Sequence, residues 1–427
     1  MRLLQRVVLA LLLCLGGFVA VVWSLNLRGE ERLRDMPLPG PATPLEVARG
    51  AYLARAGNCM TCHTERGGVA YAGGRAIATP FGTVYAGNLT PDTATGIGSW
   101  TPDHFWRALH HGRSKDGRLL YPAFPYPNYT QVTRADSDAL YAYLRSLAPV
   151  DRPNTAHQLR WPYSTQPALA VWRALYFRPG SYREQAAQSA QWNRGAYLVQ
   201  GLGHCSACHT ARNALGASAD LMDLSGGLIP MQNWYAPSLA SPGEAGVAGW
   251  QLADITQLLA TGVAPGGTVL GPMADVVLNS TQYLEPVDLH AMASYLQALP
   301  QKEHRIDTAR PSLPRTAVAE RGAQLYTDHC LQCHGAQGQG VAGAYPPLAG
   351  NRAITMTATA NLVQVLLGGG YPPATAGNPR PFGMPPYATV LSDADIAAVL
   401  THIRTSWGNS AAPVAEFAVS QQRGSIR

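Results

Sequence analysis

The feature that most constrains this chain is the pentad Cys-x-x-Cys-His, which occurs three times. Apart from Cys14, every cysteine of the chain lies in one of these pentads. With 7 cysteines and 12 histidines in 427 residues, only about 0.003 such pentads are expected by chance. The three copies are Cys59-Met-Thr-Cys62-His63, Cys205-Ser-Ala-Cys208-His209 and Cys330-Leu-Gln-Cys333-His334.

This spacing predicts covalent attachment of haem. Thiols at positions i and i+3 lie on one face of a helical turn, where both can reach the vinyl groups of one porphyrin and form thioethers. The adjoining histidine can then bind the iron from the proximal side. We therefore expect three covalently bound haem c groups, with His63, His209 and His334 as axial ligands.

Three other interpretations of the pentads are weaker. Disulfides between i and i+3 occur in exported proteins but give no role to the following histidine. A zinc site needs a fourth ligand, and no second pair of ligands accompanies each pentad. A thioredoxin-like dithiol normally occurs once, within a βαβ unit.

Each pentad belongs to a larger repeat. Arg-Gly-Ala stands a few residues before it, at 49–51, 194–196 and 321–323, on what we expect to be a short helix. Loop-like stretches that begin with tyrosine follow, at 85–89, 235–239 and 345–348. A backbone carbonyl in each could accept the second ring N–H of the proximal histidine and fix its tautomer, although an ordinary turn explains each stretch equally well.

Each repeat then continues with a middle helix and a closing helix, and no convincing strand pattern appears. The middle helices are expected at 101–110, 251–260 and 360–367, and the closing helices at 136–147, 286–299 and 393–406. Thr101 is expected to cap the first of these, and Thr133-x-x-Asp136 and Ser392-x-x-Asp395 resemble capping boxes.

These elements predict a mainly α chain with three tandem helical domains. The segment before the domains begins with Arg2 and Arg6 and continues with 17 unbroken apolar residues, the short end of a membrane span. No small-x-small cleavage site is evident near residues 21–26, so a retained anchor is favoured over a cleaved signal peptide. In both cases the basic flank stays in the cytoplasm and the rest is exported.

The predicted boundaries are 1–32 for the anchor or signal segment, 33–148, 191–300 and 316–410 for the three domains, 149–190 and 301–315 for linkers, and 411–427 for a tail. The first linker carries an apolar patch at 169–177, which could rest on a partner or fill the seam between domains. The tail after Asn409 is expected to fray.

Methionines are expected to supply the second axial ligand in two repeats, because a thioether favours ferrous iron. Met273 and Met384 each stand in a loop just before a closing helix. The other methionines are weaker candidates. Met60 lies inside a pentad, and Met292 and Met356 are expected in the core. Met222 and Met231 are alternative ligands for the second repeat.

The first repeat has Phe124 where the methionine would stand. A phenyl ring cannot bind iron, so the first haem is either five-coordinate or ligated by another side chain. The nearest candidates are His104, His110 and His111, although a histidine on a surface helix is usually only solvated.

Composition excludes several function classes. Charged residues make up 14% of the chain, too few for charge-driven disorder, and the net charge of +6 is spread along the sequence, which argues against nucleic acid. No dinucleotide-binding motif precedes a βαβ pattern, and the repeats leave no room for a separate substrate domain. We expect an electron-transfer subunit rather than a self-sufficient catalyst.

Four motifs carry a resemblance to a known family. They are R-G-A-Y-L before the first two pentads, N-L-T-P-D-T-A-T-G-I-G-S-W at 88–100, Y-P-A-F-P-Y-P at 121–127 and G-M-P-P at 383–386. With these, residues 39–409 resemble the triple-haem cytochrome c subunit of bacterial membrane-bound periplasmic dehydrogenases, the alcohol and gluconate dehydrogenase cytochrome group.

The resemblance implies class I cytochrome c domains with Met273 and Met384 as ligands beside the three pentad histidines. It also implies a catalytic dehydrogenase partner of quinoprotein, flavoprotein or molybdenum type, and ubiquinone as acceptor at the periplasmic face of the inner membrane. Phe124 departs from the family's usual methionine, and this form is similar to relatives that serve molybdenum-containing aldehyde or N-heterocycle dehydrogenases.

Two rival functions follow from the same haems. An open first haem could reduce peroxide or a similar small oxidant while the other two supply electrons. Haem-based gas sensing would need an output domain, and none is visible in the sequence.

Overall fold

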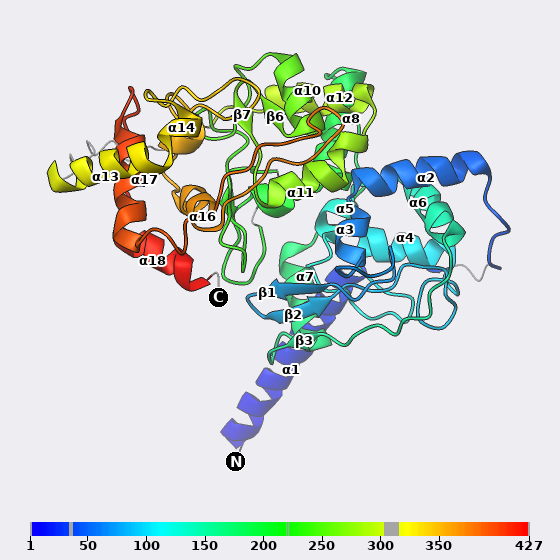
Figure 1. The fold of residues 1–427 in the computed structure, drawn as a ribbon. Helices are drawn as coiled ribbons and strands as arrows, with labels where there is room; N and C mark the ends of the chain where they lie inside the picture. Colours follow the sequence, from blue (N-terminus) through cyan, green and yellow to red (C-terminus); the bar gives the residue numbers. More distant parts are fainter. Residues whose placement is uncertain (1, 34–36, 219, 221, 303–315, 426–427) are drawn as a thin grey trace. The chain divides into compact units, whose positions relative to one another are not determined.

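The computed structural model describes residues 2–33, 37–218, 220, 222–302 and 316–425. These residues are mainly helical and divide into two compact units (Figure 1). Unit 1 contains Met1–Glu184 together with Gln200–His204 and Arg212–Leu221. Unit 2 contains Gln185–Val199, Cys205–Ala211 and Met222–Arg427. The first repeat therefore lies in unit 1, and most of the second and all of the described third repeat lie in unit 2.

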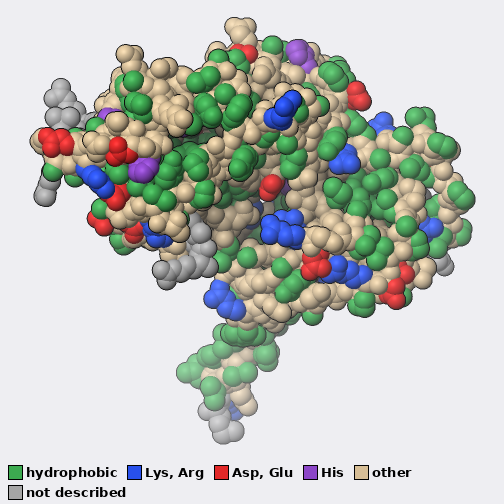
Figure 2. All heavy atoms as spheres, viewed as in Figure 1, with side chains coloured by type: hydrophobic (Ala, Val, Ile, Leu, Met, Phe, Trp, Pro, Cys, Tyr) green, Lys and Arg blue, Asp and Glu red, His purple; other side chains and the backbone are tan. Residues whose placement is uncertain are grey.

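The chain begins with the long apolar helix α1 (Arg2–Asn26), of 25 residues. Among the described residues, it is the one helix long and apolar enough to cross a membrane, and none of its most apolar stretch is buried within the protein. Hydrophobic side chains accordingly cover its exposed surface (Figure 2).

The rest of unit 1 combines helices with one small sheet. The helices are α2 (Pro44–Ala56), α3 (Cys59–His63), α4 (Pro102–His111), α5 (Tyr126–Tyr129), α6 (Arg134–Ser146) and α7 (Gln166–Tyr176). The antiparallel sheet has the order β1 (Ala76–Thr79), β2 (Gly82–Tyr85), β3 (Gln158–Leu159). Ile77 is opposite Val84, and Thr83 is opposite Gln158.

Unit 2 holds the described helices of the other two repeats. They are α8 (Ala190–Tyr197), α9 (Ser206–His209), α10 (Leu252–Thr261), α11 (Pro272–Asn279), the 3-10 turn η2 (Thr281–Tyr283), α12 (Pro286–Gln297), α13 (Thr316–His329), α14 (Leu331–His334), α15 (Arg352–Thr355), α16 (Ala360–Gly368), α17 (Asp393–Thr405) and α18 (Glu416–Ser425). A π-helical turn, η1 (Leu198–Leu202), follows α8; its residues 198–199 belong to unit 2 and 200–202 to unit 1. Two short hairpins pair β4 (Gly227–Leu228) with β5 (Tyr235–Ala236), and β6 (Val263–Ala264) with β7 (Gly267–Thr268).

Local capping explains where several helices begin, and these predictions are confirmed. Thr101 and Ser392 form complete capping boxes at the starts of α4 and α17. The Thr133 hydroxyl accepts the backbone N–H of Asp136 at the start of α6. Each such bond satisfies a backbone donor that the helix itself leaves unpaired. The six predicted middle and closing helices all form, with ends within two residues of those expected.

The first and closing helices of every repeat cross at a glycine. Gly50 on α2, Gly195 on α8 and Gly322 on α13 lie so near the closing helix that a Cβ there would overlap a backbone carbonyl oxygen. The carbonyls belong to Ala139, Ala291 and Ala398 of α6, α12 and α17. The absence of a side chain lets the two backbones touch, which no other residue type permits.

An ion pair flanks each of these crossings. The arginine before the glycine reaches an aspartate in the first turn of the closing helix, in the pairs Arg49–Asp136, Arg194–Asp288 and Arg321–Asp395. In the second repeat the guanidinium is bidentate, with N–O distances of 2.8 and 2.6 Å to the carboxylate. This geometry fixes the register in which the two helices cross.

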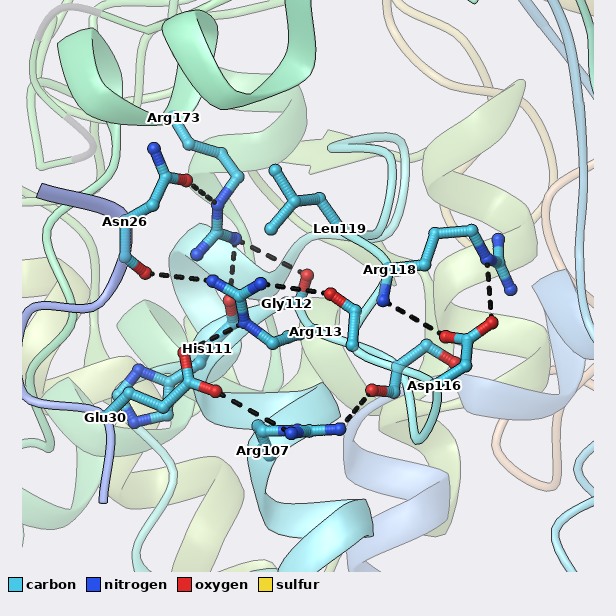
Figure 3. Close-up of polar contacts among 12 residues, drawn as sticks. Asn26, Glu30, Arg107, His111, Gly112, Arg113, Asp116, Arg118, Leu119 and Arg173 are labelled. Carbon is cyan, nitrogen blue, oxygen red and sulfur yellow. Dashed lines mark hydrogen bonds and ion pairs between the residues drawn. The ribbon is translucent and has the colours of Figure 1, made fainter. Parts of the chain in front are cut away.

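The junction between α1 and the rest of unit 1 is buried and polar. The Asn26 side chain, at the end of α1, donates to the Ala170 carbonyl of α7 (2.9 Å) and accepts from Arg173 Nε (2.9 Å). Arg173 is only 3% exposed, and burial lowers the pKa of its guanidinium. This guanidinium also donates to the His111 carbonyl at 2.6 Å (Figure 3).

Four residues after Asn26, Glu30 supplies a carboxylate to two more arginines. It accepts from Arg113 Nε at 2.9 Å and lies 3.9 Å from the Arg107 guanidinium (Figure 3). The side chains of this group are 9–15% exposed, so the charges are largely removed from solvent. Of the residues that follow α1, Glu30 therefore has its side chain packed into unit 1, whereas residues 27–29 and 31–33 are exposed.

The segment predicted as the first linker is an integral part of unit 1. It contributes β3 to the sheet and α7 to the contact with α1. Its apolar patch is largely internal, since Leu169, Ala174 and Phe177 are all buried. Trp161 is exposed. Most of the second predicted linker, 303–315, lies outside the described residues.

Two expectations are wrong. Short strands do form in the described residues, as three hairpins with β3 added to one of them, but each strand has only two to four residues and is too short to leave an alternating pattern. The described part of the tail, 411–425, does not fray: α18 packs on α16 and α17, and Val419 is fully buried. Arg423 on α18 donates to the Leu391 carbonyl (2.8 Å) and pairs with Asp393 (2.5 Å).

The helix crossing generates a stability prediction. Gly195→Ala is expected to destabilise unit 2 by about 1–3 kcal/mol, because the new methyl group must push α8 away from α12. Gly249→Ala is the matched control, since a Cβ there meets nothing within 4 Å. Thermal unfolding of the two variants measures the difference, and equal melting temperatures would contradict the close crossing.

Candidate haem sites

Each pentad forms a single helical turn after the first helix of its repeat, with the π-helical turn η1 between the two in the second repeat. These turns are α3, α9 and α14, and the first cysteine of the second and third pentads caps its turn. None of the six pentad cysteines forms a disulfide with another. Among the described residues, no group of three metal-binding side chains suits a zinc ion. The geometry of the described residues therefore gives no support to the disulfide and zinc interpretations of the pentads.

The first thiol of each pentad is held in its protonated form by its surroundings. Burial, together with the neighbouring thiol, raises the pKa of Cys59 and of Cys205 to about 12. The same causes raise the pKa of Cys330 to about 11. Cys62 and Cys208 are exposed, whereas Cys59 and Cys205 are partly buried. Each of the first two pentads therefore has one partly buried and one exposed cysteine.

All three pentad histidines make the same hydrogen bond. Nδ1 of His63 lies 2.7 Å from the Gly87 carbonyl oxygen, Nδ1 of His209 lies 2.7 Å from that of Pro237, and Nδ1 of His334 lies 3.1 Å from that of Pro346. Since a carbonyl only accepts, Nδ1 carries the proton, and Nε2 keeps its lone pair. The predicted role of the tyrosine-led loops is confirmed in every repeat.

Burial lowers the pKa of all three imidazoles, so the neutral form is favoured. A neutral ring with a bonded Nδ1 and an available Nε2 is the state that binds a metal. The donor set of each pentad, two cysteines without a disulfide beside such an imidazole, therefore fits a covalently attached haem.

The carbonyl loop of the first repeat is held by the segment that follows the repeat. Asn154 Oδ1 accepts the backbone N–H of Asn88 (2.7 Å), and His157 Nδ1 accepts that of Tyr85 (3.2 Å). The two bonds flank Gly87, whose carbonyl meets His63. Sequence reasoning missed both residues, because an asparagine and a histidine in a proline-rich segment carry no motif.

In the third repeat, Asn409 performs the corresponding task. Its side chain donates to the Leu348 carbonyl (3.0 Å) and accepts from the Gly350 N–H (2.9 Å). It also donates to the Ile403 carbonyl of α17 (2.8 Å), and it is only 6% exposed. The loop after Pro346 is thereby fastened to the closing helix.

Met384 lies in a loop before the closing helix, as predicted. Its backbone exchanges two hydrogen bonds with Gly370, of 2.8 and 3.0 Å. Its side chain is half-buried and packs on the hydrophobic core of the third repeat, and the Cys330 side chain packs on the same core. The fold therefore brings this methionine to the core that also carries the pentad.

Met273 is half-buried and lies in the first turn of α11, rather than in a loop. The correction has a local cause: Pro272 occupies the first turn, which proline favours, and Gly271 turns the chain with a φ of 56°. The Trp234 indole occupies the space where a Cβ of Gly271 would be. Met292 and Met356 are 4% and 6% exposed, which confirms their assignment to the core.

In the first repeat, Phe124 packs in an aromatic group beside the pentad. Its ring centroid lies 5.3 Å from that of Tyr129. The Tyr129 hydroxyl donates to the Gly57 carbonyl (3.0 Å), and burial and the nearby thiols of Cys59 and Cys62 hold its pKa well above the usual value. Tyr129 was not singled out from the sequence.

The three candidate histidines of α4 each have their own partners. His104 Nδ1 belongs to the capping box of Thr101. His110 is buried and stacks on Trp106 with centroids 4.2 Å apart, and His111 packs edge-on against His110. A role for any of them as an iron ligand stays a prediction.

Comparison with known proteins agrees with this geometry. The family model described as Cytochrome c matches residues 47–148 and 319–407. The pentads, their carbonyl-bonded histidines and the surrounding helices thus define a c-type cytochrome.

Several relatives are similar over most of the chain. The alcohol dehydrogenase (quinone) cytochrome c subunit of Gluconacetobacter polyoxogenes is 41% identical over 86% of this chain and 81% of its own length. The gluconate 2-dehydrogenase cytochrome c subunit of Pantoea cypripedii is 38% identical over 86% of each chain. A nicotinate dehydrogenase subunit of Pseudomonas putida is 40% identical over 89% of this chain but only 32% of its own length.

The chain belongs to the family of cytochrome c subunits of dehydrogenases, which are electron-transfer subunits rather than catalytic ones.

The buried histidines of α4 generate a pH prediction. Burial lowers the pKa of His110 from 6.5 to about 4, and burial and neighbouring positive charges lower the pKa of His111 to about 3. Below pH 6.5 the unfolded imidazoles bind protons that the folded ones do not, so unit 1 is expected to lose stability as the pH falls from 6.5 towards 4.

His110→Phe keeps the ring stack on Trp106 and removes one titrating group, so its stability should depend less steeply on pH. His290→Phe is the control, because His290 is exposed. Urea unfolding at pH 7, 5.5 and 4.5 measures the slopes. Identical slopes for the two variants would contradict a neutral, buried His110.

Proposed function

We propose that this chain carries three covalently bound haem c groups and relays electrons through them. The pentad cysteines attach the haems, and Nε2 of His63, His209 and His334 binds the irons. Met273 and Met384 complete the second and third sites. The observation that carries the proposal is the Nδ1-to-carbonyl hydrogen bond, which recurs in all three repeats and leaves Nε2 of each ring available.

When bound, haem supplies an iron that exchanges single electrons without breaking bonds. The residues of the chain set the conditions for that exchange. The backbone carbonyls orient the imidazoles and raise their basicity. Buried aromatic side chains such as Tyr129 keep water from the pentad of the first repeat. The three-domain division at 33–148, 191–300 and 316–410 follows from one haem per repeat.

The donor of electrons is a catalytic dehydrogenase subunit, and the acceptor is ubiquinone. This proposal draws on the relatives, which are named as cytochrome subunits of alcohol, gluconate and fructose dehydrogenases. Similarity to the nicotinate dehydrogenase protein of Pseudomonas putida keeps a molybdenum-type partner beside the quinoprotein and flavoprotein types. With such a partner and acceptor, we infer that the chain works on the periplasmic face of the bacterial inner membrane.

Helix α1 is retained in the mature protein as a membrane anchor. A signal peptide ends in a small-x-small cleavage site, but none is evident near residues 21–26, and the helix continues to Asn26, whose side chain is buried against α7. Four residues further on, the Glu30 carboxylate forms ion pairs with Arg107 and Arg113. Cleavage between Trp23 and Glu30 would separate this buried group from the helix that positions it.

Intact mass spectrometry of the mature protein from membranes tests both parts of the proposal. The mass is expected to exceed that of the polypeptide by three haems, and peptides from Arg2–Asn26 should be present. The double variant Cys205→Ala, Cys208→Ala should lose one haem and keep the other two. A mature chain with no added mass refutes haem attachment, and a new N-terminus after Trp23 refutes the anchor.

Substitution of the methionines tests the assignment of the axial ligands. Met384→Leu keeps the volume but removes the thioether that favours ferrous iron, so one haem should show a lower midpoint potential. Met356→Leu is the matched control, because Met356 lies in the same repeat but in the core. Redox titration followed by optical spectroscopy measures both. Three unchanged potentials in Met384→Leu would remove Met384 from the ligand set.

A further inference from the structure

The carbonyl loop of the second repeat is held in part by residues of the third repeat. Asn361, in the first turn of α16, donates to the Tyr235 carbonyl and accepts the Tyr235 backbone N–H, both at 2.8 Å. Tyr235 stands two residues before Pro237, whose carbonyl bonds His209. One side chain of the third repeat thus satisfies both backbone groups of a residue beside the haem-supporting carbonyl.

A second side chain of the third repeat holds the other flank of the same loop. Arg352 on α15 donates to the carbonyls of Pro242 (3.0 Å) and Gly246 (2.5 Å). Its guanidinium also lies over the Trp250 ring, 5.1 Å from the centroid. Arg352 therefore fixes the turn at residues 242–246 from outside the second repeat.

That turn is connected directly to the loop that carries Pro237. Glu244, which stands within the turn, accepts the backbone N–H of Ser238 at 2.6 Å and is only 8% exposed. Its carboxylate also accepts the Tyr235 hydroxyl at 3.1 Å. Asn361 acts on the residue two positions before Pro237, and Arg352 acts through Glu244 on the residue directly after it.

We propose that Asn361 and Arg352 are positioning residues for the haem of the second repeat, so that the redox potential of this haem depends on the docking of the third repeat. The proposal rests on the proposed function, because it requires that His209 binds haem iron. The loops of the first and third repeats do not depend on another repeat in this way. Asn154 and His157, from the segment after the first repeat, hold the first loop. Asn409, which follows the closing helix of the third repeat, holds the third loop.

The physical link is the strength of the hydrogen bond from His209 to Pro237. A short bond to a fixed carbonyl makes the imidazole a more basic ligand, which favours ferric iron and lowers the potential. If the loop loosens, this bond lengthens and the potential of the second haem rises. The haems of the first and third repeats keep their own supports and should not respond.

The experiment uses the full-length holoprotein with Asn361→Ala and Arg352→Ala. The control is Thr375→Val, which removes another contact between the repeats, the 3.4 Å bond from Thr375 Oγ1 to the Thr261 carbonyl, away from the Pro237 loop. Redox titration should give a higher potential for the second haem in both variants and unchanged potentials in the control. NMR should show a weaker hydrogen bond at His209 Nδ1–H.

Asn361→Asp distinguishes positioning from general packing. It keeps the side-chain volume but sets a carboxylate oxygen against the Tyr235 carbonyl oxygen, which it repels, so the His209 Nδ1–H hydrogen bond should weaken as in Asn361→Ala although no packing volume is lost. The inference is overturned if Asn361→Ala and Arg352→Ala keep three haems and show unchanged potentials and an unchanged His209 signal. That outcome leaves the proposed function intact. Absence of haem from the unsubstituted protein would instead overturn the proposed function.

Discussion

The close crossing of the first and closing helices is the constraint on which the rest of the structure depends. In every repeat a glycine lets the two backbones touch, and an arginine–aspartate pair fixes their register. The pentad begins within a few residues of the end of that first helix, with the π-helical turn intervening in the second repeat. The position of each cofactor site is therefore set by a contact that involves no cofactor-binding residue.

The helix crossing positions the pentad, but a separate set of contacts fixes the tautomer and orientation of its histidine. The carbonyl that meets each Nδ1 belongs to a loop without regular structure, and such a loop needs support from elsewhere. Side-chain amides, a carboxylate and an imidazole provide it, as with Asn154 and His157 in the first repeat and Glu244 in the second. The haem sites are thus built from two layers: a repeated helical frame and loop supports that differ from repeat to repeat.

The sequence predicted the frame far better than the supports. The pentads, the helices with their caps and the carbonyl loops could be predicted because their spacing repeats within the chain. The helical start at Met273, the short hairpins and the packed helix α18 could not, because local turns and tertiary packing decide them. Asn361 carries no local signal at all, since its role arises only when a distant backbone meets it.

The junction at Asn26 has a mechanical consequence. A haem domain on a flexible tether would sample many heights above the lipid surface and would meet a lipid-soluble partner by random search. Here the end of α1 is fastened to Arg173 and Ala170 by two hydrogen bonds of 2.9 Å, which hold the helix in one arrangement with the rest of unit 1. If α1 spans the bilayer as proposed, the pentad of the first repeat keeps a constant distance from the lipid surface, and lateral diffusion in the membrane plane is its main remaining motion.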